Sequence, residues 1–249
     1  MKIIGIIPAR YGSSRFPAKA LANIKGKPMV QWVWEKAKAC TVLDEVIVAT
    51  DHPAIYEAVE KAGGKACMTN ESHQSGTDRC HEALMQQKEA YDYVINIQGD
   101  EPFIDPGQIK ALAALLNGQT ELATLMKRIK DPAYLFSPNT VKVVANEVGQ
   151  ALYFSRSPIP HIRNQKEEEW LQAHSFYKHI GIYAYRADVL EKITRLPPSS
   201  LEQAESLEQL RWLQAGFRIQ LAETSLESMG IDTPEDLQRA LAFLDSKDL

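Results

Sequence analysis

The chain alternates short apolar runs with amphipathic segments. Three β-branched runs have the composition of buried strands: 2–7, 45–50 and 93–98. Three further segments have the apolar spacing of helices: 28–38, 52–62 and 78–89. The alternation predicts an α/β fold, Rossmann-like, with a mainly parallel central sheet covered by helices and joined by right-handed crossovers.

The pattern changes after Asp105, where a D-x-x-Q capping pattern opens a predicted helix that runs through Leu116. Four strand-like runs then follow, separated by long polar connections: 122–126, 140–145, 151–154 and 179–185. A helix at 206–215, a strand at 218–222 and a final helix that begins at Thr233-Pro234 complete the chain. We predict a single domain over 1–249, with a β-rich inserted lobe or dimerisation surface at about 121–185.

Composition places the protein among ordinary globular chains, with 249 residues, 45% hydrophobic and 24% charged. Its formal net charge of −4 argues against a generic nucleic-acid binder, which should be basic. The charge is nevertheless uneven. Residues 1–43 hold eight lysines and arginines against Glu35 alone, which favours a local anion site over chance surface charge only weakly.

The three cysteines are odd in number and lack C-x-x-C spacing, which argues against a disulfide framework or a zinc site and suits a reducing cytoplasm. No stretch approaches the roughly 18 apolar residues that span a bilayer. The apolar start ends at Pro8, too early for a signal peptide. We therefore expect a cytoplasmic protein without membrane insertion.

The three predicted strands end in polar segments, and ligands of open parallel sheets bind beyond such carboxyl ends. The first segment, PARYGSSRFPAK, matches neither standard phosphate-binding fingerprint. Its small residues still allow close backbone approach to an anion, and Arg10, Arg15 and Lys19 can neutralise phosphate charge. A solvated basic loop is an equally good interpretation from composition alone.

Asp100 follows the third strand and lies directly after Gly99, which permits close backbone approach. Mg²⁺ takes one or two carboxylates together with substrate phosphates, so Asp100 is a candidate ligand, although Gly-Asp is also a common turn. Asp232 is a candidate second acid. It could instead help to cap the last helix.

Other motifs are weaker when taken singly. The SGTDR segment containing Ser75 and Arg79 suits either an anion site or an ordinary capping turn, and we favour the turn. Arg156 could pair with a substrate carboxylate or lie free on the surface. His179 and Tyr183 share one face of a strand, as pocket or, more often, core residues. Glu208 and Gln209 would normally face solvent.

Together the motifs resemble the sugar-acid cytidylyltransferases. The resemblance rests on IIPARYGSSRFPAKAL, VIVATDHPAI, SGTDR, QGDEP, ALYFSRSPIP, YKHIGIYAYR, ESLEQLRWLQAG and GIDTPEDL, in family order over nearly the whole chain. Several motifs are those of the branch that acts on 3-deoxy-D-manno-octulosonate (Kdo). The resemblance implies a nucleotide-diphospho-sugar transferase type of fold and transfer of CMP from CTP to the anomeric hydroxyl of Kdo, with release of pyrophosphate, for lipopolysaccharide biosynthesis.

The resemblance also implies roles for residues. The catalytic set would be Arg10, Lys19 and Asp100. The nucleotide-binding set would be Ala9, Arg10, Gly12, Ser13, Lys19, Ser75, Arg79 and Gln98. The sugar-binding set would be Arg15, Gln98, Arg156, His179, Tyr183, Glu208 and Gln209. Asp100 and Asp232 would bind Mg²⁺, and the protein would be a homodimer, through the lobe at about 121–185.

The chain departs from the family at Ala18-Lys19-Ala20, where Gly-Lys-Pro is common, and at Ser13-Ser14-Arg15-Phe16, often Ser-Thr-Arg-Leu. Lys19 is kept, so we expect phosphate binding by a stiffer or differently aimed loop. Alternatives remain: a cytidylyltransferase for 8-amino-Kdo or sialic acid, a glycosyltransferase, or a non-catalytic sugar-nucleotide binding module.

Overall fold

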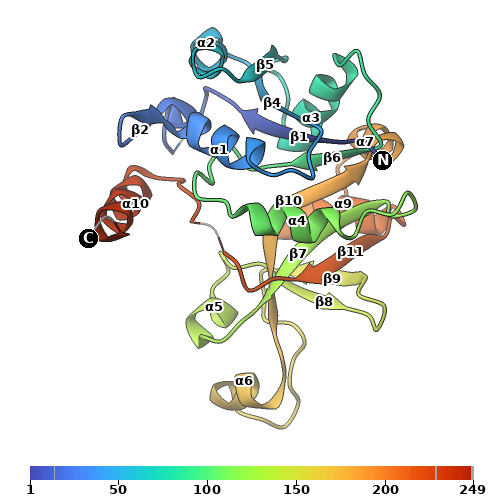
Figure 1. Ribbon diagram of the computed structural model, residues 1–249. Helices are drawn as coiled ribbons and strands as arrows, with labels where there is room; N and C mark the ends of the chain where they lie inside the picture. The colour runs from blue at the N-terminus through green and yellow to red at the C-terminus, as the bar shows by residue number, and fades with distance from the viewer. Residues whose placement is uncertain (14, 228, 248–249) are drawn as a thin grey trace. The chain divides into compact units, whose positions relative to one another are not determined.

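The computed structural model describes residues 1–13, 15–227 and 229–247 (Figure 1). Ser14, which belongs to the first motif, lies outside the described residues. The chain divides into two compact units, which are described separately: unit 1 comprises Met1–Lys110 and Glu227–Leu249, and unit 2 comprises Ala111–Leu226.

The sheet of unit 1 is parallel throughout, in the order β6-β1-β4-β5. Its strands are β1 (Ile3–Ala9), β4 (Glu45–Thr50), β5 (Lys65–Met68) and β6 (Tyr93–Asn96). A two-stranded hairpin of β2 (Asn23–Ile24) and β3 (Lys27–Pro28) stands apart. Ile4, Ile6 and Ile7 of β1 are completely buried, because both faces of a parallel sheet are covered.

Helices cover this sheet (Figure 1). They are α1 (Met29–Lys38), α2 (Pro53–Lys61) and α3 (Gly76–Met85). The 3₁₀ turn η1 (Lys19–Leu21) contacts α1 and α2, and the last helix α10 (Pro234–Lys247) shares a small hydrophobic cluster with Ile24 and Met29. Helix α4 (Pro106–Ala113) runs across the boundary between the units. Helices α1 and α2 pack on β4, and α3 packs on β1 and β6.

The strand order places a topological switch at β1. The chain first moves outward from β1 to β4 and β5, and then returns to form β6 on the other side of β1. Because all these strands are parallel, their carboxyl ends share one edge, as expected from the sequence. The crevice of such a sheet opens where the strand order reverses, so the ends of β1 and β6 should flank the ligand site.

Unit 2 is built on a mixed sheet, in which β7 pairs in parallel with β11 and antiparallel with β10, while β8 pairs antiparallel with β10 and β9. Its strands are β7 (Leu122–Arg128), β8 (Lys142–Ala145), β9 (Ala151–Ser155), β10 (Tyr177–Arg186) and β11 (Ile219–Glu223). Its helices are α5 (Pro132–Phe136), η2 (Glu167–Glu169), α6 (Trp170–Ala173), α7 (Ala187–Thr194), α8 (Ser200–Glu205) and α9 (Gln209–Gln214).

The predicted α/β class with a mostly parallel, helix-covered sheet is confirmed. Some predicted elements are wrong in detail. The helix expected at 206–215 begins only at Gln209, because Ser206 adopts a left-handed conformation (φ 52°) that ends α8. Helix α3 starts earlier and stops at Met85 rather than at 89. The lobe expected at about 121–185 for dimerisation and sugar binding stays a prediction.

Candidate active site

The loop after β1 carries most of the basic residues expected to bind phosphate. Ala9 at the end of β1 is buried and Arg10 is exposed. The loop closes on itself, since the amide of Ala18 donates to the carbonyl oxygen of Tyr11 at 3.0 Å. Ala18 has φ 53° and ψ 27°, the left-handed region that favours glycine. The closed loop delivers Lys19 to the start of η1.

Residues 98–100 run against the end of β1. A Cβ atom at Gly99 would lie 2.6 Å from the carbonyl oxygen of Pro8, which is backbone and cannot yield. Only glycine fits this contact, which agrees with the close approach inferred from the sequence. Gln98 and Asp100 are therefore held beside the loop that follows β1.

Lys19 joins two carboxylates that are far apart in the sequence. Its Nζ atom lies 2.7 Å from Oδ2 of Asp100 and 2.8 Å from Oδ1 of Asp232. Arg15 adds a further ion pair to Asp232, at 3.1 Å. Burial opposes the charged form of Lys19, but the carboxylates outweigh it and raise the lysine pKa. Lys19 is thus cationic near neutral pH, and the two acids converge on one cation.

The start of α10 explains why the Asp232 carboxylate is available for this contact. The amide of Asp236 donates to Thr233 Oγ1 at 3.2 Å, and Asp236 Oδ2 accepts from the amides of Asp232 and Thr233. The helix is therefore capped by Thr233 and Asp236. The amide of Ile231 donates to the carbonyl oxygen of Asp100 at 2.8 Å, which holds Asp232 beside the end of the sheet.

The acid pair suits a hard cation. Asp100 and Asp232 already enclose a positively charged atom, and within the described ranges no group of three or more His, Cys, Asp or Glu side chains could hold a metal. Two carboxylates that leave further positions to phosphate and water are what Mg²⁺ takes.

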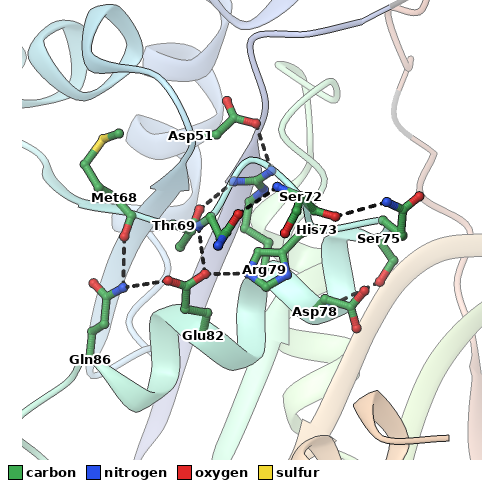
Figure 2. A network of polar contacts seen from close by, with 12 residues as sticks. Asp51, Met68, Thr69, Ser72, His73, Ser75, Asp78, Arg79, Glu82 and Gln86 are labelled. Carbon is green, nitrogen blue, oxygen red and sulfur yellow. Dashed lines mark hydrogen bonds and ion pairs between the residues drawn. The ribbon is translucent and has the colours of Figure 1, made fainter.

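The SGTDR segment forms the start of α3, as expected from its capping pattern (Figure 2). Ser75 Oγ accepts a hydrogen bond from the amide of Asp78 at 3.1 Å. Arg79, which is 3% exposed, donates to Thr69 Oγ1 at 2.5 Å and to Asp51 at 2.9 Å. The guanidinium is thus fixed by its own fold, and any contact with a ligand would use its remaining N–H groups.

The loop between β5 and α3 is tied down by a second residue of α3 (Figure 2). Glu82 Oε2 accepts from the amide of Asn70 at 2.8 Å and bonds to His73 Nε2. Gln86, one turn further along, donates to the carbonyl oxygen of Met68 at 2.9 Å. These contacts fix the segment in which His73 and Ser75 reach the cavity described next.

A cavity of about 280 Å³ opens at the carboxyl edge of the unit 1 sheet. Most of the expected nucleotide and metal residues line it: Ala9, Arg10, Ser13, Arg15, Lys19, Ser75, Arg79, Gln98, Asp100 and Asp232. Gly12 is not among its lining residues. The structure therefore brings together, around one cavity, residues from three separate sequence motifs and Asp232, which lies just before α10.

The remaining expected residues, all assigned to the sugar, lie in unit 2. Arg156 donates from Nε to the carbonyl oxygen of Glu205 at 2.7 Å, from Nη1 to Pro138 at 3.0 Å and from Nη2 to Ser206 at 3.3 Å. The buried ammonium of Lys142 donates to the carbonyl oxygen of Arg156 at 2.5 Å. The guanidinium is held in place and keeps one N–H on each Nη for a carboxylate.

His179 lies against a bulge in β10. Thr124 Oγ1 is 3.0 Å from His179 Nε2, 3.0 Å from the carbonyl oxygen of Ile180 and 2.7 Å from that of Ile182. A hydroxyl has one proton, which it donates to a carbonyl, so Nε2 of His179 must donate to Thr124. Desolvation lowers the pKa of His179 to about 3, so the ring is neutral near pH 7.

Tyr183 packs beside His179, with ring centroids 5.2 Å apart, and its ring also meets Trp212 edge-on. Burial, with smaller contributions from Tyr185 and Glu208, raises the pKa of Tyr183 well above its usual value. Its hydroxyl is buried and has no hydrogen-bond partner within the described residues. A buried hydroxyl of this kind is costly unless a ligand or water completes it.

Glu208 and Gln209 begin helix α9. Glu208 Oε1 accepts from Arg211 at 3.2 Å, and Gln209 is 5% exposed. The solvent-facing position expected for Gln209 is therefore wrong, because the first turn of α9 packs inward. Glu208 remains half-buried.

Sequence reasoning did not single out several residues at these sites. Pro8, Ala20, His73, Gln74 and Gly76 also line the cavity. Asp51 and Thr124 hold site residues without having been assigned roles. Asp51 had a usable signal, its place directly after β4, whereas nothing near Thr124 in the sequence reveals its contact with His179, 55 positions away.

Among the described residues, no helix combines the length and apolar character that crossing a membrane requires.

The family model described as "Cytidylyltransferase" matches residues 4–222. The chain is 55% identical to the 3-deoxy-manno-octulosonate cytidylyltransferase of Parabacteroides distasonis, covering 98% of both chains. It is 54% identical to the protein of the same name from Phocaeicola vulgatus, covering 100% of this chain and 99% of the relative.

Solved structures agree with these matches. The chain resembles the CMP:2-keto-3-deoxy-manno-octonic acid synthetase complexed with CTP, with a TM-score of 0.92, 45% identity, and coverage of 99% of this chain and 100% of the other. A 4-diphosphocytidyl-2C-methyl-D-erythritol synthase from Anaerococcus prevotii has a TM-score of 0.64 at 17% identity over 98% of both chains, a likeness of fold alone.

Proposed function

Because the chain belongs to the cytidylyltransferase family, we propose that it transfers CMP from CTP to the anomeric hydroxyl of Kdo, with release of pyrophosphate. The observation that carries the proposal is the match to Kdo cytidylyltransferases over nearly the full length of both chains. Those names favour Kdo over sialic acid or 8-amino-Kdo as the acceptor. The product would be the activated sugar for lipopolysaccharide biosynthesis.

We assign the cavity of unit 1 to CTP. Arg10, Arg15 and Lys19 supply positive charge around it, and Ser75 begins helix α3 at its wall. The N-terminus of a helix offers free N–H donors and a positive dipole end to an anion. Gln98, Ala9 and Ser13 supply polar and small surfaces beside the charged groups. A triphosphate needs this combination of charge and backbone donors.

We further propose that Asp100 and Asp232 bind Mg²⁺ together with the phosphates. Support comes from their convergence on the single cation Lys19 Nζ. When bound, Mg²⁺ would neutralise phosphate charge and favour ionisation of a hydroxyl near it. Lys19 would then turn from the carboxylates to the phosphates.

In unit 2, we assign Arg156, His179, Tyr183, Glu208 and Gln209 to the sugar. The two spare N–H groups of Arg156 suit the Kdo carboxylate. The buried hydroxyl of Tyr183 suits a sugar hydroxyl. His179, neutral and with its proton on Nε2, offers Nδ1 as an acceptor for another sugar hydroxyl.

The chemical step follows from these roles. The anomeric oxygen of Kdo forms a bond to the α-phosphorus of CTP, the bond from that phosphorus to the bridging oxygen of pyrophosphate breaks, and the hydroxyl proton passes to water. Both substrates are anions and repel each other, so the basic loop must offset that repulsion. In-line alignment of the attacking and leaving oxygens lowers the barrier further, and no covalent intermediate with the protein is needed.

We also propose a cytoplasmic homodimer. The three cysteines of the described fold form no disulfide, and Cys40 and Cys80 are buried, which suits a reducing compartment. The dimer is implied by the family resemblance, and size-exclusion chromatography with light scattering tests it.

Pyrophosphate release tests the proposal. Purified protein is given CTP, Mg²⁺ and, separately, Kdo, 8-amino-Kdo or sialic acid. We expect release with Kdo to exceed release with either other acid. Efficient release with sialic acid alone would replace the proposed acceptor, and CTP binding without release from any sugar acid would point to a binding module.

A further inference from the structure

Asp51 lies directly after β4 and joins two segments that are distant in the sequence. Its Oδ1 atom accepts from the amide of Tyr11 at 2.9 Å, and its Oδ2 atom accepts from Nη2 of Arg79 at 2.9 Å. The side chains of Asp51 and Arg79 are 11% and 4% exposed, so solvent screens the pair little. Asp51 itself is not among the residues that line the cavity.

The first arm of this connection fixes the base of the basic loop. The amide of Tyr11 is held by Asp51, while its carbonyl oxygen accepts from Ala18 and closes the loop directly before Lys19. The Tyr11 ring also stacks on His52, the neighbour of Asp51, with centroids 3.8 Å apart. Tyr11 at the start of the loop is thus held against the end of β4, and its hydrogen bond with Ala18 holds the other end of the loop to the same place.

The second arm joins Asp51 to Arg79, which lines the cavity, and through Arg79 to Thr69 (Figure 2). Arg79 Nη1 also donates to Thr69 Oγ1, and this hydroxyl in turn donates to the carbonyl oxygen of Thr50 at 3.1 Å. The amide of Thr69 donates to the same oxygen at 2.8 Å. The ends of β4 and β5 and the start of α3 are thus tied to the carboxylate that holds the basic loop.

We infer that Asp51 is a positioning residue for CTP: it holds the two ends of the basic loop, at Tyr11 and Ala18, in register with the segment of residues 75–79 without touching the nucleotide. The inference rests on the proposed function for the identity of the ligand. A cavity held in its binding geometry binds more tightly, because less ordering is left for the ligand to impose. Loss of the connection should therefore weaken CTP binding.

The variant Asp51→Asn keeps the size and shape of the side chain but removes its negative charge. A carboxylate accepts from Tyr11 and Arg79 at once through two oxygens, whereas the asparagine amide has a single acceptor oxygen. In Asp51→Asn one of the two contacts must face an NH₂ group. Asp44→Asn is the matched control, because Asp44 accepts from the amide of Ile3 at 2.7 Å, at the other end of β1.

The test is calorimetric titration of each protein with CTP, with steady-state kinetics in parallel. We expect the Kd for CTP to rise about tenfold in Asp51→Asn, which corresponds to about 1.4 kcal/mol, and to stay within about twofold in Asp44→Asn. The KM for CTP should rise with the Kd while the KM for Kdo stays unchanged. Equal CTP affinity in wild type and Asp51→Asn overturns the inference, as does an equal loss in the control.

If the Asp51→Asn variant folds poorly, Asp51→Glu serves as a second test of the inference. It keeps the charge beside Arg79 and moves the acceptor by one methylene, so we expect a folded protein with several-fold weaker CTP binding and faster amide hydrogen exchange in residues 10–19. Unchanged exchange and affinity in this variant would also contradict the inference. If the wild type itself fails to bind CTP, the proposed function fails instead, and the exchange measurement still reports on the loop.

Discussion

Lys19 holds the two acids of the site together, because its ammonium group lies within 2.8 Å of both Asp100 and Asp232. A partly buried cation with two carboxylate partners and a raised pKa stays charged across the physiological range. The same charge is available to a triphosphate that enters the cavity. Lys19 is therefore the residue whose partners should change most when CTP binds.

Replacement of Lys19 by alanine should raise the KM for CTP about ten- to a hundredfold, the range expected for the loss of a hydrogen bond to a charged group. Lys27→Ala is the matched control, since Lys27 also forms an ion pair, with Glu35 at 2.8 Å, yet does not line the cavity. Initial rates at varied CTP measure both. A change confined to the KM for Kdo would contradict the phosphate assignment.

Replacement of Asp100 by asparagine should lower kcat about 100-fold, because a neutral amide is a weaker ligand for Mg²⁺ and packing is scarcely altered. Asp245→Asn is the control, as Asp245 pairs with Lys25 at 3.0 Å. Rates at saturating substrates over a range of Mg²⁺ concentrations measure the effect. Turnover near that of the wild type at high Mg²⁺ would count against the assignment.

His179 should make folding depend on pH. Its pKa is about 3 in the folded protein and about 6.5 in an unfolded chain, so the unfolded state binds more protons below pH 6.5. Its contribution to stability is present above that pH and is lost as the pH falls towards 3. Between pH 7 and pH 5 we expect a loss on the order of 1–2 kcal/mol.

Urea unfolding of wild type and His179→Gln at both pH values measures this loss, since glutamine keeps an N–H donor for Thr124 and does not titrate. The variant should lose less stability than the wild type on going to pH 5. An identical loss in both proteins would show that other groups carry the pH dependence.

Among the elements, the loop that carries Lys19 is held in a conformation its sequence does not favour. Ala18 adopts φ 53°, where the Cβ atom costs roughly 1–2 kcal/mol. The expectation of a stiffer or differently aimed loop stays a prediction; the structure shows that the hydrogen bond from Ala18 to Tyr11 is made in this strained conformation.

Ala18→Gly should therefore raise the free energy of unfolding by about 0.5 kcal/mol, since relief of strain exceeds the entropy that glycine adds to the unfolded chain. Ala22→Gly is the matched control: at φ −56° no strain is present, and the same change should be destabilising. Chemical unfolding measures the pair. Destabilisation of similar size in both variants would show that the left-handed conformation at Ala18 carries no cost.

Most strands of unit 1 could be predicted from the sequence, because a strand buried on both faces appears as a continuous apolar, β-branched run. The run EVIVAT is buried at five of its six positions and forms β4 over the predicted range. β5 was missed because KACM has exposed ends and no β-branched residue. Helix α8 was missed and α9 was predicted to begin at 206, because the left-handed turn at Ser206 has no glycine to mark it.

At the scale of the whole molecule, several basic residues of the N-terminal segment form ion pairs with acidic residues near the end of the chain. Lys19 pairs with Asp232, and Lys25, for which the sequence suggested no role, pairs with Asp245. Lys27 pairs locally with Glu35 and lies over the Trp32 ring. Composition indicated an anion site but could not say which of the basic residues form it.

The residues of the candidate site that belong to sequence motifs could be predicted. Those whose role depends on contacts between distant parts of the chain could not. The resemblance named Lys19, Asp100 and Asp232, and the structure shows these residues in contact across up to 213 positions of sequence. Asp51 had a signal in its place directly after β4, but its partners Tyr11 and Arg79 depend on the fold, as does the contact of Thr124 with His179.

The most direct test of the central claim follows the anomeric oxygen. Kdo labelled with ¹⁸O at the anomeric hydroxyl is incubated with CTP, Mg²⁺ and the protein, and the products are analysed by mass spectrometry. Attack on the α-phosphorus predicts that the label appears in the CMP–sugar and that the pyrophosphate is unlabelled. An unlabelled CMP–sugar, or the absence of a CMP–sugar, would contradict the account.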